Sequence, residues 1–151
     1  MSDNLVPFWE KSYREYDAIT FSNKPNSTIT EFEHLIGNPS KVYQFEQRYD
    51  MITCFGTLHF VTKNDWKRFI NNAKKYTNIG GIHIIQIFTD TVPASEDIAP
   101  FAIGLAKDEE LKELYADWEI LQFKSYVFED EHPNVPKHLH ASNKIVARKV
   151  R

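Results

Sequence analysis

A strand, a helix and a second strand predicted over residues 49–89 constrain the fold of this chain more than any other feature. Residues 49–55, YDMITCF, form the short apolar run typical of a strand. Apolar residues then recur every three or four positions, which predicts a helix over residues 64–75. Residues 82–89, IHIIQIFT, are almost continuously apolar, as in a parallel strand covered on both faces. This unit predicts two parallel strands joined by a helix, with ligand sites at their carboxyl ends.

Two helices are predicted ahead of this unit, with little chain left to connect them to it. Aromatic residues after Pro7 recur at helical spacing, and residues 28–37 begin with a capping box and end at a glycine. Only residues 38–48 separate the second helix from the first strand, whereas one unit of strand, helix and strand takes roughly 30 residues or more. We therefore expect no further such unit between these helices and residue 49.

The remaining sequence predicts one helix and two further strands. Residues 108–116 begin with three acidic residues, which favour a helix start, and residues 118–128 and 143–150 have strand character. Residues 129–142, EDEHPNVPKHLHAS, contain three of the six histidines and are predicted to form a loop, because they are too many for a tight hairpin turn. We predict a single α/β domain over residues 1–151, with a mixed sheet of about four strands, two parallel and then an antiparallel C-terminal pair, and flanking helices.

Charge and cysteine content exclude several classes of protein. The net charge of −3 is spread without a basic run, so we expect no nucleic-acid partner. No apolar stretch approaches the roughly 20 residues of a membrane span, and the polar N-terminus lacks a signal-peptide pattern, so no membrane partner is expected. The single cysteine, Cys54, lies in an apolar strand and cannot form an internal disulfide, which favours a reducing, cytoplasmic setting.

Several segments of the chain resemble a known family. In order, YDMITCFGTLHFV, NIGGIHIIQIFTDTVPASEDIAPFAIGL, DEELKELYADWEILQFKSYVFEDEHP and NKIVARK resemble the second half of class I S-adenosylmethionine-dependent methyltransferases, with the closest likeness to the tellurite-resistance (TehB-type) group. Residues 1–37 are similar to the helical N-terminal lead-in of that group, and residues 49–150 to its C-terminal half. The resemblance implies a truncated Rossmann-like methyltransferase fold.

The resemblance also implies where a cofactor would bind. Such enzymes hold S-adenosylmethionine with a glycine-rich turn after the first strand and an acidic residue after the second. The five glycines of this chain, at 37, 56, 80, 81 and 104, form no G-x-G pattern, so we predict that no cofactor binds tightly. Gly56, Thr57 and His59 match the remaining wall of the cofactor pocket. A structural role for His59 is an equal alternative, because apolar residues follow it.

A histidine cluster is the other chemical signal. Phe88, Thr89, His132, His138 and His140 are predicted to line the substrate side, where the resemblance implies that histidines hold a small oxyanion. A metal site is a minority alternative, and we predict none, because H-x5-H-x-H matches no standard zinc spacing. The simplest alternative is an exposed polar loop. His83, inside a buried strand, is expected to be structural.

Two functions remain from the sequence, with a third as a weaker possibility. The first is a methyltransferase-like protein without conventional cofactor binding or catalysis, serving as a non-catalytic binding or interaction module. The second is an active methyltransferase of a small soft nucleophile or oxyanion, with its pocket rebuilt in a dimer. The third is a metal-dependent enzyme that uses the histidine cluster.

A homodimer is predicted from the first strand. Residues 49–55 contain no lysine or proline, which commonly protect an exposed strand edge. We expect this edge and the N-terminal helices, with Trp9, Tyr13 and residues 29–36, to meet a second copy of the chain.

Overall fold

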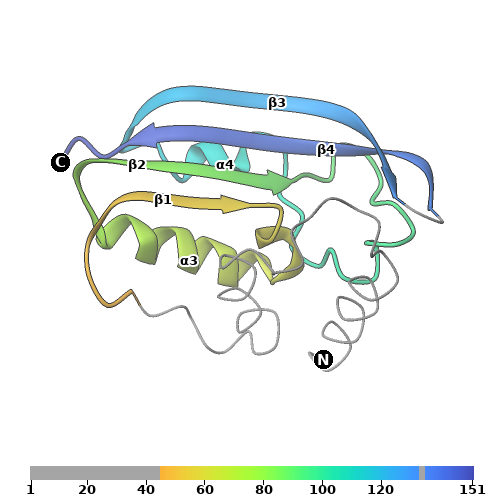
Figure 1. The fold of residues 1–151 in the computed structure, drawn as a ribbon, viewed down its shortest axis with the longest axis horizontal. Helices are drawn as coiled ribbons and strands as arrows, with labels where there is room; N and C mark the ends of the chain where they lie inside the picture. Colours follow the sequence, from red (N-terminus) through yellow and green to blue (C-terminus); the bar gives the residue numbers. More distant parts are fainter. Residues whose placement is uncertain (1–44, 133–134) are drawn as a thin grey trace. The chain divides into compact units, whose positions relative to one another are not determined.

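The described part of the protein is built around one four-stranded sheet. The computed structural model describes residues 45–132 and 135–151; the two predicted N-terminal helices lie outside these residues. The strands are β1 (Tyr49–Phe55), β2 (Thr77–Phe88), β3 (Glu119–His132) and β4 (Val135–Arg148), in the order β1-β2-β4-β3 (Figure 1). β1 and β2 are parallel, whereas β4 is antiparallel to both β2 and β3. The predicted mixed sheet is confirmed.

Helix α3 (Lys63–Lys75) connects the two parallel strands, as its periodicity predicts. The Thr62 hydroxyl accepts a hydrogen bond from the Asp65 amide and caps the first turn. Lys74 and Lys75 lie in the last turn, where positive charge suits the helix dipole. The apolar positions are buried: Trp66, Phe69, Ile70 and Ala73.

The two faces of the sheet are covered differently within the described residues. Ile52 and Cys54 of β1 pair with His83 and Ile85 of β2, and all four side chains are buried on the face that Tyr115 contacts. The alternate positions of β2 are half-buried, and Met51 of β1 is 61% exposed. The described residues therefore bury only one face of β2, whereas the sequence predicted that both faces are covered.

The C-terminal strands correct one prediction. Residues 129–142 do not form a loop, because β3 continues to His132 and β4 begins at Val135. Asp130 pairs with His138, and Phe128 pairs with His140. The prediction was wrong because the end of β3 and the start of β4 are rich in polar residues, as loops are. Their side chains nevertheless alternate with a period of two, which suits a two-stranded ribbon with one covered face.

Smaller elements also differ from the prediction. The helix predicted over residues 108–116 is reduced to one turn, α4 (Glu110–Glu113), and a 3-10 turn, η1 (Leu58–Phe60), follows β1. β2 begins at Thr77, so residues 78–81, NIGG, belong to the strand, which starts earlier than the predicted residue 82. None of the helices in the described ranges is long and apolar enough to cross a membrane.

Candidate functional site

The turn after β1 carries the first group of predicted site residues. Gly56 has a φ of +64°, a conformation that favours glycine, and it turns the chain out of the strand. Thr57 lies 3.1 Å from the Cys54 sulfur through its hydroxyl oxygen. His59 follows within η1, and its carbonyl accepts a hydrogen bond of 2.9 Å from the Gly104 amide. The turn is thus anchored to the segment that follows β2.

Three predicted site residues meet in one stack of rings. Phe88 ends β2, and its ring stacks on His59 with the centroids 4.2 Å apart and the planes inclined by 8°. The same phenylalanine ring stacks on His140 of β4, with centroids 4.6 Å apart and planes inclined by 21°. The structure therefore brings together the predicted cofactor-side and substrate-side residues at the carboxyl ends of β1 and β2.

Burial fixes the electrostatic state of His59. Its side chain is 1% exposed, and neither ring nitrogen has a hydrogen-bond partner among the described residues. Burial, and then the nearby His140, lower the pKa of His59 to about 3, so the ring is neutral at physiological pH. The ring packs as an aromatic group, and its two nitrogens mark a place where a small polar ligand or a water molecule would be stabilised.

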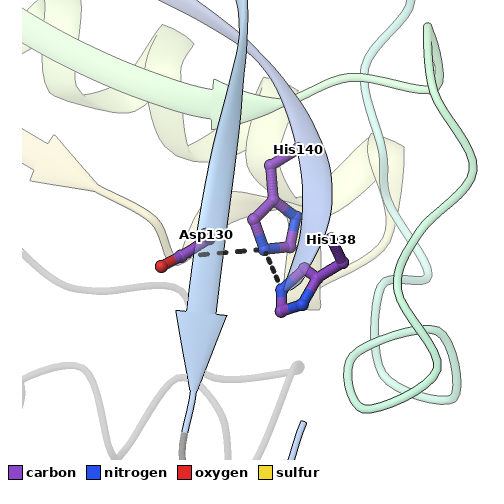
Figure 2. A group of neighbouring side chains, drawn as sticks. All are labelled: Asp130, His138 and His140. Carbon is purple, nitrogen blue, oxygen red and sulfur yellow. Dashed lines mark hydrogen bonds and ion pairs between the residues drawn. The ribbon is translucent and has the colours of Figure 1, made fainter. Parts of the chain in front are cut away.

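The hairpin of β3 and β4 carries the second group. Because Asp130 and His138 are directly opposite in an antiparallel pair and His140 is two residues further along, all three side chains lie on one face. The Nε2 atoms of His138 and His140 are 3.0 Å apart, and the Nε2 of His140 lies 3.8 Å from Oδ2 of Asp130 (Figure 2). The sequence interpretation did not assign Asp130 to the site, because a loop gives no register across the two arms.

The other two predicted site residues are Thr89 and His132. Thr89 is buried, its amide donates to the Ala141 carbonyl, and its hydroxyl lies 3.0 Å from that of Thr91. His132 lies at the end of β3, where its backbone pairs with Val135. Thr89 is not part of the ring stack, and the side chain of His132 lies outside the described part of the structure.

His83 lies in a buried hydrogen-bond chain away from these groups. Its Nε2 is 2.7 Å from the Thr77 hydroxyl oxygen, and its Nδ1 is 2.7 Å from the Tyr115 hydroxyl oxygen. Because the Thr77 hydroxyl donates to the Ala73 carbonyl, it accepts from Nε2, and Tyr115 donates to Nδ1. A neutral ring satisfies every group in this chain, which fits the structural role expected for His83.

A family model and two sequence relatives match the chain. The model described as "Tellurite resistance protein TehB" matches residues 15–141. A Haemophilus influenzae protein described as "Probable S-adenosyl-L-methionine-dependent methyltransferase TehB" is 35% identical over 80 residues, which are 52% of this chain and 27% of that protein. Its counterpart from another strain is 34% identical over the same length. The matched residues therefore span about a quarter of the length of these relatives.

Solved structures show the same fold. The crystal structure of TehB from Haemophilus influenzae aligns with a TM-score of 0.59 and 24% identity, covering 97% of this chain and 47% of that one. A SAM-dependent methyltransferase from Methanosarcina mazei aligns with a TM-score of 0.53 and 17% identity, covering 75% and 65%. The sheet is thus part of a Rossmann-like methyltransferase fold, and by the match of its family model this chain belongs to the TehB tellurite-resistance family.

Proposed function

We propose that this TehB-family chain does not hold S-adenosylmethionine tightly and instead serves as a binding or interaction module without conventional methyl transfer. The observation that supports this most is the contact between His59 and Phe88. Rings with centroids 4.2 Å apart leave no space for a third group between them. At this wall of the family's pocket, His59 and Phe88 therefore contact each other and leave no room for a ligand between their rings.

The residues at this edge do not fit S-adenosylmethionine. The Thr57 hydroxyl is engaged with Cys54, and His59 is buried. No glycine-rich turn accompanies them, because the five glycines of the sequence form no G-x-G pattern.

Calorimetric titration with S-adenosylmethionine and S-adenosylhomocysteine tests the proposal. Hydrogen bonds to charged groups contribute about 1.5–3 kcal/mol each, so losing several of them moves a micromolar dissociation constant beyond about 1 mM. The TehB protein of Haemophilus influenzae, titrated in parallel, controls for the quality of the ligands. A dissociation constant below about 10 μM for this chain would contradict the proposal.

A second candidate is an active methyltransferase whose pocket is completed by a second copy of the chain. The exposed edge of β1 favours it. β1 pairs with β2 alone among the described strands, while Met51 and Phe55 are 61% and 46% exposed. A two-fold partner at this edge, together with the N-terminal helices, would cover these side chains and bring a new wall beside Gly56 and His59.

The oligomeric state separates the two candidates. Light scattering at micromolar concentration reports the mass, and the cofactor titration is repeated at that concentration. A dimer that binds S-adenosylmethionine supports the second candidate, whereas a dimer or a monomer without binding supports the first. A monomer that binds tightly contradicts both.

A reducing, cytoplasmic setting is part of the first proposal. Cys54 is fully buried, and burial raises the pKa of its thiol to about 12. Such a thiol is protonated and unreactive, which suits a cysteine that serves only as a small apolar side chain.

A further inference from the structure

We propose that Asp130, His138 and His140 form a binding site for a divalent transition-metal ion of the zinc class. The inference rests on the geometry of the hairpin alone, so it holds whether or not the chain binds S-adenosylmethionine. It also revises the expectation of no metal, because that expectation rested on the spacing of the histidines along the chain and had no strand register to pair Asp130 with His138.

The strand register places the three side chains together. Asp130 on β3 is directly opposite His138 on β4, and His140 is the next residue of β4 on the same face. One ligand atom from each residue lies within 4.8 Å of those of the other two. Figure 2 shows the two imidazoles beside each other and a dashed line from His140 to Asp130 on the neighbouring strand. Two histidines and one carboxylate are a ligand set that zinc and related ions accept.

The tautomer of His138 suits a ligand. Its Nδ1 lies 2.8 Å from the Pro136 carbonyl oxygen, and a carbonyl oxygen only accepts hydrogen bonds. Nδ1 therefore carries the proton, and Nε2 directs a lone pair toward His140. Metal-binding histidines commonly donate their other ring N–H to a backbone carbonyl in this way.

The carboxylate is oriented as well. Oδ1 of Asp130 accepts a hydrogen bond of 2.9 Å from the Glu131 amide, and Oδ2 lies toward His140. The ring of His140 is restrained in turn by its stack on Phe88. Each of the three ligands is thus positioned by a further contact, as the surroundings of a metal require.

The distances between ligand atoms are near those of a coordinated ion. Zinc binds nitrogen and oxygen at about 2.0–2.2 Å, so two ligand atoms of a tetrahedral site lie roughly 3.3–3.6 Å apart. The observed separations of 3.0 Å between the two histidine nitrogens and 3.8 Å between His140 and Asp130 fall on either side of this range. The Asp130 side chain is 38% exposed and can rotate to complete the site, which leaves a fourth position for water or a small anion.

Without metal, the same contact is a hydrogen bond from Nε2–H of His140 to Nε2 of His138. Metal binding moves that proton to Nδ1 of His140, so the ring stays neutral and its Nε2 lone pair turns to the ion. The test must therefore distinguish a metal site from a pair of hydrogen-bonded histidines.

Zinc titration of the tag-free, chelator-stripped full chain against a chromophoric chelator provides the test. We expect one equivalent of Zn²⁺ per chain, and at least a tenfold loss of affinity in Asp130→Asn and in His138→Gln. Glu129→Gln is the matched control, because it removes one carboxylate from the neighbouring position, where Glu129 pairs with Lys137 and belongs to the opposite face of β3. Its affinity for Zn²⁺ is expected to be unchanged.

Cobalt provides a second measurement. Co²⁺ added to the stripped protein is expected to give the visible absorption of a four- or five-coordinate ion in the unaltered chain and in Glu129→Gln, and to lose it in Asp130→Asn. Circular dichroism of each metal-free variant checks the fold. If His138→Gln fails to fold, Asp130→Asn against its control still decides the question.

Three outcomes would overturn the proposal. The first is the absence of stoichiometric zinc binding. The second is equal binding by Asp130→Asn and Glu129→Gln, which would indicate an adventitious ion only. The third is binding of inorganic phosphate to the metal-free protein, abolished by His138→Gln, with no zinc binding, which would assign the histidines to an anion.

Discussion

Replacing Gly104 by alanine tests how firmly the segment after β2 is fastened to the turn after β1. A Cβ atom at this position would overlap the carbonyl oxygen of Val61 and would lie 3.2 Å from the carbonyl carbon of Thr62. Both are backbone atoms, which cannot rotate away as the end of a flexible side chain can. The segment that carries Gly104 must therefore move.

The cost of that movement follows from two hydrogen bonds. The Gly104 amide donates to the His59 carbonyl at 2.9 Å, and the buried Trp66 Nε1–H donates to the Gly104 carbonyl at 2.9 Å. Losing a hydrogen bond costs about 0.5–1.5 kcal/mol, and leaving a buried donor without a partner costs about 1–3 kcal/mol. We expect Gly104→Ala to lower the free energy of unfolding by about 2–4 kcal/mol.

Urea denaturation followed by tryptophan fluorescence and circular dichroism measures this difference. Gly56→Ala is the control, since its φ of +64° disfavours alanine but no atom lies within 4 Å of the added carbon. Strain alone predicts a loss of about 1–2 kcal/mol there. The reasoning fails if Gly104→Ala destabilises the protein no more than Gly56→Ala does.

Two further predictions follow from burial. Burial, and then the charges of Lys74 and Lys149, lower the pKa of His83 to about 3 in the folded protein. The unfolded chain, in which histidine titrates near 6.5, therefore binds a proton more readily than the folded chain. The free energy of unfolding is highest above pH 6.5 and decreases as the pH is lowered, by about 2 kcal/mol between pH 6.5 and 5. Denaturation curves at several pH values should show a smaller loss in His83→Gln, and an unchanged slope would refute the assignment. If the edge of β1 joins two copies, Met51→Lys should shift the mass measured by light scattering from dimer to monomer; a persistent dimer would place the interface elsewhere.

The success of sequence interpretation differed between elements for physical reasons. α3 was predicted well, because four apolar residues at helical spacing and a threonine cap point to the same answer. The hairpin arms were missed, because their polar residues satisfy the alternation of a strand without the apolar character that usually reveals one. Alternation alone would not have paired Asp130 with His138, because the register shifts between Asp130 and His132, and the two residues lie at unequal distances from the two-residue connection.

The stack of Phe88 on two histidines could be predicted only in part. The sequence placed His59 and Phe88 at neighbouring strand ends, which the parallel pairing of β1 and β2 makes close in space. It could not place His140 against the same ring, because that contact depends on β4 lying beside β2 and extending past its end. Register between distant strands is set by the whole sheet, and short motifs carry little information about it.

The strand order also sets the sequence of events in folding. β4, the last of the described strands to be synthesised, lies in the interior of the sheet between β2 and β3. Until residues 142–148 have left the ribosome, β2 lacks one neighbour, and β3 pairs only with residues 135–141 of β4. The nascent chain must therefore keep incomplete strand edges in solution and then close a long loop between β2 and β4, which slows folding.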